Sequence, residues 1–167
     1  MTVYLDYNAT APLSPAARAA WLAAQDEAWG NPGSIHAIGQ LARHRLDQAK
    51  TLIAQQLDCA AGELIVTSGG SEANATAIRA GLVHGGSAAC SAVEHSSVLR
   101  NIEGSGRPLC LLPVDGEGRI LPISLASDAR LLCLQFANNE LGVLNDIPAL
   151  VAAARATHPT LWIHCDA

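Results

Sequence analysis

A glycine-rich turn is the first stretch of this sequence whose residue types suit chemistry. The segment "TSGGSEANATA" (67–77) puts two glycines and Ser71 between an apolar run and a helix-forming segment. Backbone N–H groups at the start of a helix, with the helix dipole behind them, bind anions such as phosphate. Gly69 and Gly70 leave the backbone open to an anion, while Ser71 adds a hydroxyl and is a candidate helix cap. The spacing matches neither GxxxxGK[ST] nor GxGxxG, so the turn predicts either a phosphate site or an ordinary capped helix.

Polar residues also follow three later apolar runs. Glu94 and His95 come after "SAACSAV", Asn138 and Asn139 follow "ARLLCLQFA", and Asp166 follows "LWIHC". Each has an ordinary structural explanation, because a lone histidine is often structural, asparagine is a common turn residue and aspartate caps helices. In parallel α/β sheets, however, ligands bind at the carboxyl ends of the strands. If the apolar runs are parallel strands, these side chains and the glycine turn share one edge of the sheet.

This set of groups suits pyridoxal 5′-phosphate. The glycine turn would take the phosphate, and the imidazole of His95 would stack on the pyridine ring. An asparagine amide would hydrogen-bond the phenolic oxygen, and the carboxylate of Asp166 would pair with the pyridinium nitrogen. That charge pair preserves the ring's capacity to withdraw electrons. We expect no metal site, because the five cysteines include no CxxC pair.

The elements that must position these residues alternate between strands and helices. Alternation of this kind predicts an α/β fold, with a mostly parallel sheet and helices on both faces, in a chain whose 167 residues suit one domain. The apolar runs predict strands at 3–5, 63–68, 87–93, 107–114, 129–137 and 160–166. The periodic segments predict helices at 15–29, 38–57, 73–84, 94–104 and 147–158. Ser14 and Pro15 are typical of the start of the first helix.

The composition narrows the possible partners and location. The net charge is −5, which argues against nucleic acid or an anionic membrane as the main partner, since both attract a basic face. No apolar run approaches the roughly 20 residues of a membrane-spanning helix. The first residues, "MTVYLDYNATAPLSP", show no secretory signal, and the cysteines lack paired spacing, so we expect a reduced, cytoplasmic protein.

Six motifs, in order, resemble the N-terminal portion of the NifS/IscS-like cysteine desulfurases. This family lies in the class-V aminotransferase group of fold-type I pyridoxal phosphate enzymes. The resemblance covers nearly all of the chain and rests on "YLDYNATAPLSP", "GNPGSIHAIGQLAR", "IVTSGGSEANATAIRA", "VEHSSVL", "NNELGVLNDI" and "HCDA". It implies that these residues belong to the large, cofactor-binding domain of that fold.

The resemblance also implies roles for individual residues. Gly70 and Ser71 would bind the cofactor phosphate, with Ser71 standing where the family usually has threonine. His95 would stack on the ring and act in catalysis by relaying protons. Asn139 would contact the ring oxygen, and Asp166 would pair with the ring nitrogen. The segment around Asn8 and Thr10 and the loop 31–36 resemble loops near the family's pocket, and we assign them no role.

For the whole protein, the resemblance implies removal of sulfur from L-cysteine. The products would be alanine and an enzyme persulfide, which feeds iron–sulfur cluster or thio-cofactor assembly through a sulfur-acceptor or scaffold protein. Members of the family are homodimers. Their Schiff-base lysine, their sulfur-accepting cysteine and their small C-terminal domain follow the segment that resembles this chain.

The only lysine here, Lys50, lies in a predicted helix, where it is an ordinary solvated side chain. We therefore expect 1–167 to be part of the large domain, truncated before that lysine, inactive alone and exposing an unpaired sheet edge. Two alternatives stay open at this point. One is another class-V enzyme, such as a selenocysteine lyase or an aminotransferase. The other is a non-catalytic split subunit that acts by assembly with a complementary chain.

Overall fold

The computed structural model describes residues 3–7 and 9–167, which form two compact units. The first unit is Met1–Val66 and the second is Thr67–Ala167. Each is described by itself below. The predicted site residues Gly70, Ser71, His95, Asn139 and Asp166 all belong to the second unit.

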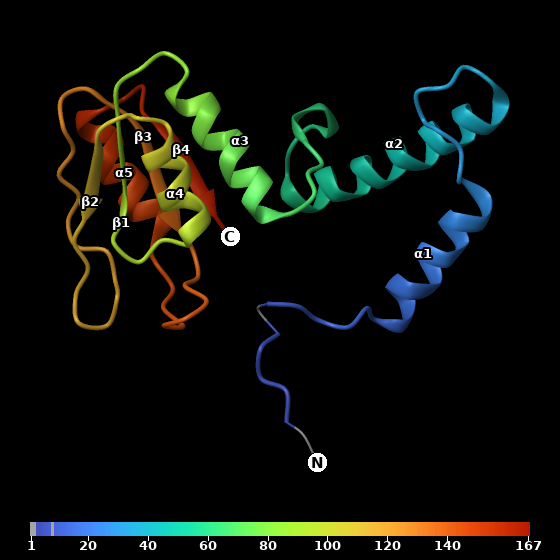
Figure 1. Ribbon diagram of the computed structural model, residues 1–167, viewed down its shortest axis with the longest axis horizontal. Coiled ribbons are helices and arrows are strands. Elements are labelled where there is room, and N and C mark those ends of the chain that lie inside the picture. Colours follow the sequence, from blue (N-terminus) through green and yellow to red (C-terminus); the bar gives the residue numbers. More distant parts are fainter. Residues whose placement is uncertain (1–2, 8) are drawn as a thin grey trace. The chain divides into compact units, whose positions relative to one another are not determined.

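A four-stranded sheet organises the second unit (Figure 1). Its strands lie in the order β2-β1-β3-β4, and every neighbouring pair is parallel. The strands are β1 (Ser87–Ser91), β2 (Leu109–Leu112), β3 (Ala129–Gln135) and β4 (Trp162–Asp166). The helices of this unit are α3 (Gly70–Leu82), which precedes β1, α4 (Ser96–Gly104), between β1 and β2, and α5 (Ile147–Thr157), between β3 and β4. Short apolar runs joined by helices produce this arrangement, because parallel strands require a crossover connection.

Helices cover both faces of this sheet, because alternate residues of each strand point to opposite sides. On one face, side chains of α3 and α4 pack against alternate strand residues, in the cluster Ile78, Leu82, Ala88, Cys90, Val98, Ile102, Leu131 and Cys133. The other face packs against α5, in the cluster Ala89, Leu112, Ala129, Leu132, Leu134, Ala154 and Leu161. The predicted fold class, a parallel sheet with helices on both faces, is confirmed.

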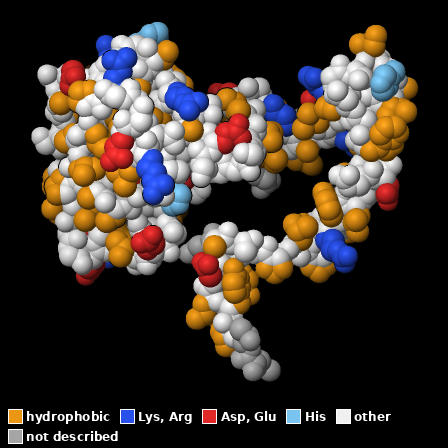
Figure 2. Space-filling model, in the orientation of Figure 1, with side chains coloured by type: hydrophobic (Ala, Val, Ile, Leu, Met, Phe, Trp, Pro, Cys, Tyr) orange, Lys and Arg blue, Asp and Glu red, His pale blue; other side chains and the backbone are white. Residues whose placement is uncertain are grey.

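The first unit is helical in its described part. It contains α1 (Pro15–Glu27), α2 (Ala37–Leu57) and the short 3₁₀ helix η1 (Ala61–Glu63). The predicted start of α1 is confirmed, since the Ser14 hydroxyl accepts a hydrogen bond from the Ala17 N–H and Pro15 occupies the first turn. Hydrophobic side chains nevertheless lie on the surface of both long helices (Figure 2). The exposed ones include Trp21, Leu22, Leu41, Leu52, Ile53 and Leu57.

Two predicted strands do not form. Residues 3–5 and 64–67 have irregular backbone, and residue 63 belongs to η1. Ile65 and Val66 are each 75% exposed. A strand exists only through hydrogen bonds to a neighbouring strand, and within the described residues no strand lies beside either segment. Residues 63–68 therefore have the composition of a strand, but they lack the neighbouring strand with which they would have to pair.

The helix after the glycine turn also begins earlier than predicted. It starts at Gly70, with Gly69 as its N-cap, so Ser71 lies in the first turn and is not the cap. Because Gly69 has no side chain, this cap supplies no side-chain hydrogen bond. None of the helices in the described residues is long and apolar enough to cross a membrane.

Candidate cofactor site at the carboxyl edge of the sheet

The carboxyl ends of β3 and β4 bring the first site residue into place. Asp166, the last residue of β4, lies beside Gln135, the last residue of β3. The Phe136 N–H donates to the Asp166 carbonyl oxygen at 2.8 Å. His164 lies two residues before Asp166, so both side chains project from the same face of the strand. The edge predicted from the apolar runs therefore carries a carboxylate and an imidazole on one face.

The N-terminus of α3 is open for a ligand. Apart from the adjacent residues and the backbone of the helix itself, no heavy atom lies within 4 Å of the Cβ position at Gly69 or Gly70. The Ser71 side chain is exposed, and its hydroxyl has no hydrogen-bond partner among the described residues. Glu72 also lies in this first turn, and its carboxylate accepts the Ser68 N–H at 2.7 Å, which lowers its pKa. Unpartnered first-turn N–H groups, a free hydroxyl and open space make a set of donors that fits a phosphate.

Asn74, one helical turn after Gly70 and Ser71, joins α3 to β4 and α4. Its side chain is buried and lies between Asp166, Ser97 and His164. The Nδ2 atom donates to Asp166 Oδ2 at 3.0 Å and to Ser97 Oγ at 2.9 Å, and Oδ1 lies 2.8 Å from His164 Nε2. Sequence reasoning missed this residue. The spacing could have indicated it, because Asn74 is three positions after Ser71 and so lies on the same side of the helix.

His95 sits at the start of α4 as its N-cap. Its Nδ1 accepts the Ser97 N–H at 3.1 Å and lies 2.7 Å from Ser97 Oγ. The rest of the imidazole is exposed. Because Ser97 also bonds to Asn74, His95 and Asp166 belong to one hydrogen-bond network, although they follow different strands.

Two neighbouring asparagines in the loop after β3 have different roles. Asn138 is buried; it donates to the Val93 carbonyl at 2.8 Å and accepts the N–H groups of Glu140 and Leu141. Asn139 is exposed, and its Oδ1 accepts from Gln135 Nε2 at 3.3 Å. Asn138 therefore shapes the loop, and Asn139 is the amide that faces outward.

Glu94 is a buried carboxyl group at the same edge, and sequence reasoning gave it no role. Only 6% of the residue is exposed. Its Oε1 accepts the Gln135 N–H at 2.7 Å, whereas Oε2 is buried without a hydrogen-bond partner in the described residues. Burial raises the pKa of Glu94, interactions with Gln135 and Ser91 oppose the rise, and the nearby carboxylate of Asp166 adds to it. Burial also lowers the pKa of His164, against the opposite effect of Asp166.

Two of the four thiols in the sheet do not resemble reactive cysteines. Cys90 and Cys133 are fully buried in the core beneath α3 and α4. Burial raises the pKa of Cys90 to about 12 and raises that of Cys133 as well. A thiol must ionise to act as a nucleophile, so these two are structural. Within the described residues, no group of three or more histidine, cysteine, aspartate or glutamate side chains is placed to hold a metal ion.

The remaining sequence-predicted positions lie in the first unit. Asn8 is outside the described residues, and Thr10 is exposed. In the loop 31–36, Asn31 Oδ1 accepts the Gly33 N–H at 2.8 Å, and His36 caps α2 by accepting the Gly39 N–H at 3.2 Å. These contacts form the turn that leads into α2, so they have a structural role.

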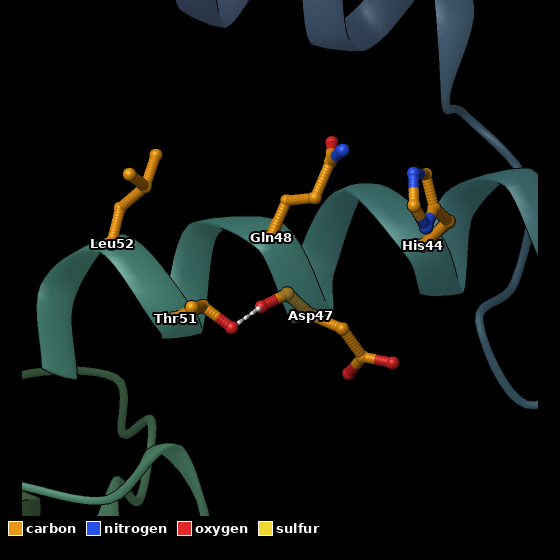
Figure 3. Close-up of a pocket in the computed structure, with 5 residues that line it drawn as sticks. All are labelled: His44, Asp47, Gln48, Thr51 and Leu52. Atoms are coloured by element: carbon orange, nitrogen blue, oxygen red, sulfur yellow. Dashed lines mark hydrogen bonds between the residues drawn. The ribbon is translucent and has the colours of Figure 1, made fainter. Parts of the chain in front are cut away.

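A surface depression also lies in the first unit, along α2 (Figure 3). It is lined by His44, Asp47, Gln48, Thr51 and Leu52. Thr51 Oγ1 donates to the Asp47 carbonyl at 2.8 Å, which is an internal bond of the helix (Figure 3). All five lining residues come from one helix, and none was a predicted site residue, so we do not regard this depression as the candidate site.

Comparison with known proteins decides the family. The family model "Aminotransferase class-V" matches residues 3–167. The chain belongs to the class-V aminotransferase family. The resemblance to NifS/IscS-like proteins is likewise confirmed: cysteine desulfurase IscS of Dictyoglomus turgidum is 36% identical over 176 residues, which cover 99% of this chain and 44% of that protein. The chain therefore spans less than half the length of this curated relative.

Solved structures of this family share the fold. A NifS-like protein matches with a TM-score of 0.91 at 23% identity, over 100% of this chain and 49% of its own. A second structure, described as SspA in complex with cysteine, matches with a TM-score of 0.89 at 26% identity, over 99% of this chain and 50% of its own. The expectation of a fold-type I pyridoxal phosphate architecture is confirmed for the α/β class, the parallel sheet and the helices around it.

Proposed function

We propose that this chain is the cofactor-binding part of a pyridoxal phosphate-dependent cysteine desulfurase. The observation that carries the proposal is the shared network at the carboxyl edge of the sheet. There, the exposed imidazole of His95 and the carboxylate of Asp166 are linked through Ser97 and Asn74. One helical turn earlier, Ser71 lies at the open N-terminus of the same helix that carries Asn74.

Each site residue has a role in this proposal. The N–H groups at the start of α3, with Gly70 and the Ser71 hydroxyl, would bind the cofactor phosphate. Asp166 would accept a hydrogen bond from the protonated ring nitrogen, and Asn139 would hydrogen-bond the ring oxygen. His95 would stack on the ring and move protons to and from the substrate. When bound, the cofactor supplies an electron sink that weakens bonds at the α-carbon of an amino acid.

The proposed substrate is L-cysteine, which would give alanine while its sulfur passes to a cysteine thiolate as a persulfide. Support for cysteine comes from the relatives' names and from the neighbour described in complex with cysteine. A sulfur-acceptor or scaffold protein, assembly as a homodimer, a cytoplasmic location and a place in iron–sulfur cluster assembly are proposals that follow from the family alone.

We further propose that these 167 residues are inactive by themselves. The unit Thr67–Ala167 contains no lysine to bond the cofactor covalently. The buried thiols of Cys90 and Cys133 are unsuited to accept sulfur because burial holds them protonated. The lysine and the thiolate would come from residues other than these. The chain would then hold the cofactor through non-covalent contacts only.

A binding titration with pyridoxamine 5′-phosphate tests this proposal. The amine form of the cofactor cannot bond covalently to Lys50 or to the chain's amino terminus, so it reports the non-covalent site alone. We expect Asp166→Asn and Ser71→Ala to weaken binding about tenfold each, the equivalent of one charge-assisted hydrogen bond. The control Asp26→Asn, at an exposed position of α1, should leave binding unchanged.

Two outcomes would contradict the proposal. If Asp166→Asn and Ser71→Ala bind the amine form as the unsubstituted chain does, the site lies elsewhere. If pyridoxamine without its phosphate binds equally well, the N-terminus of α3 is not a phosphate site. Separately, alanine release from cysteine above a cofactor-only control would show that the isolated chain is active and would refute its proposed inactivity.

A further inference from the structure

The side-chain amide of Asn74 uses both of its ends to join three elements. The buried residue lies in α3, yet its contacts are Ser97 of α4 and His164 and Asp166 of β4. A primary amide offers two donor hydrogens and one acceptor oxygen. Here one hydrogen serves Asp166, the other serves Ser97, and the oxygen faces His164. Asn74 therefore has the capacity to orient all three partners at once.

The carboxylate fixes which way this amide points. An ionised aspartate only accepts hydrogen bonds, so the NH₂ end of Asn74 must face Asp166. The amide oxygen then faces His164 Nε2 at 2.8 Å, and that nitrogen must carry a proton.

The other end of the network fixes the proton of His95. The backbone N–H of Ser97 can only donate, and it donates to His95 Nδ1 at 3.1 Å. Nδ1 is therefore the unprotonated nitrogen of a neutral ring, and the proton sits on Nε2. The Ser97 hydroxyl accepts from Asn74 and is 2.7 Å from the same Nδ1, so its own hydrogen completes the chain.

We propose that Asn74 and Ser97 are positioning residues that hold His95 as its Nε2–H tautomer and hold Asp166 in the orientation for a ligand's cationic nitrogen. The bonds run in one direction, from His164 through Asn74 and Ser97 to His95. His95 then presents a hydrogen-bond donor, Nε2–H, toward the open side of the site. The use of this arrangement by the cofactor rests on the proposed function, whereas the tautomer is a property of the chain alone.

Nitrogen NMR of the ¹⁵N-labelled 167-residue chain, without added cofactor, tests the inference. Two-bond ¹H–¹⁵N spectra separate the two neutral histidine tautomers by the shifts of their ring nitrogens. We expect His95 and His164 to be Nε2–H in the unsubstituted chain. Ser97→Ala removes the hydroxyl but keeps the backbone N–H, so the Nε2–H to Nδ1–H ratio of His95 should fall about fivefold, as expected for one net hydrogen bond.

The neighbouring hydroxyl gives a matched control. Ser96→Ala removes an exposed hydroxyl from the first residue of α4 and should leave the His95 ratio unchanged. Asn74→Ala should affect both ends of the network, because it removes the partner of His164 as well as a partner of Ser97. If that variant does not fold, the comparison of Ser97→Ala with Ser96→Ala still decides the matter.

The inference and the proposed function fail in different ways. If His95 carries its proton on Nδ1, or if Ser97→Ala and Ser96→Ala change the ratio equally, the positioning role is wrong, whatever the cofactor titration shows. If the tautomers are as expected but pyridoxamine 5′-phosphate does not bind, the proposed function fails and the hydrogen-bond chain stands.

Discussion

Replacing Glu94 by glutamine tests whether the buried carboxyl at the sheet edge is held in its neutral form. Glutamine has nearly the same shape, so its side-chain oxygen keeps the hydrogen bond from the Gln135 N–H, 2.7 Å in the unsubstituted protein. What it removes is the capacity to ionise. We expect Glu94→Gln to stabilise the fold at neutral and alkaline pH and to have little effect in acid.

The sign follows from the direction of the pKa shift. Burial raises the pKa of Glu94 above its usual 4.5, and the adjacent Asp166 carboxylate adds to the rise, so the folded protein favours the protonated form. The contribution of Glu94 to stability is therefore fully present below 4.5, the pKa of the unfolded chain, and is lost as the pH rises through the higher folded-state pKa. Glutamine carries no such loss.

The magnitude comes from the atom that lacks a partner. Oε2 of Glu94 is buried with no hydrogen bond among the described residues. Leaving a buried polar atom unpaired costs about 1–3 kcal/mol, and more when the group is charged. The neutral amide of glutamine, unpaired at the same place, therefore costs less than the ionised carboxylate. We expect Glu94→Gln to raise the free energy of unfolding by about 1–3 kcal/mol at about pH 8, with the difference shrinking toward zero below about pH 5.

Urea unfolding followed by far-ultraviolet circular dichroism, repeated from about pH 5 to about pH 8, measures this difference. Glu140→Gln is a suitable control, because Glu140 is an exposed glutamate in the loop that follows β3. A stability difference that stays constant across this pH range would refute the reasoning. So would a Glu94→Gln variant that is less stable than the unsubstituted protein at the alkaline end.

Two further predictions concern the packing that holds the site edge in place. Gly81→Ala puts a Cβ 2.9 Å from Leu131 Cδ1, so it should lower the free energy of unfolding, measured in urea, by about 1–3 kcal/mol. Its control is Gly104→Ala, where the added Cβ meets open space and should not destabilise the fold. Leu132→Ala removes a fully buried side chain and should lower the free energy of unfolding by about 2–5 kcal/mol in the same assay. Its control is Leu111→Ala, which should lower it by less than about 1 kcal/mol because the Leu111 side chain is 54% exposed. Equal losses within either pair would contradict the packing described here.

Several features of the fold and site were readable from the sequence. The apolar runs predicted β1 to β4 and the periodic segments predicted α3 to α5, because a strand buried between two helical layers needs apolar residues on both faces. The carboxyl-edge rule then placed His95 and Asp166 at one edge, and the structure joins them in one network.

The strand predicted at 63–68 shows a limit of prediction from local composition. Its residues have the right composition, yet Ile65 and Val66 are exposed, because β propensity acts only when a neighbouring strand supplies hydrogen bonds. In the same way, the periodicity of α2 predicted a helix correctly but could not show that Leu52 and Leu57 stay exposed in the described chain.

The sequence by itself determined the class of the fold and which residue types lie at its carboxyl edge, because both follow from local patterns along the chain. Only the tertiary structure decided how these residues cooperate. Asn74 meets Ser97 across 23 residues of chain and Asp166 across 92. Glu94 meets the Gln135 N–H across 41 residues. Hydrogen bonds depend on distance and direction in space, and no local pattern encodes those for groups that lie so far apart along the chain.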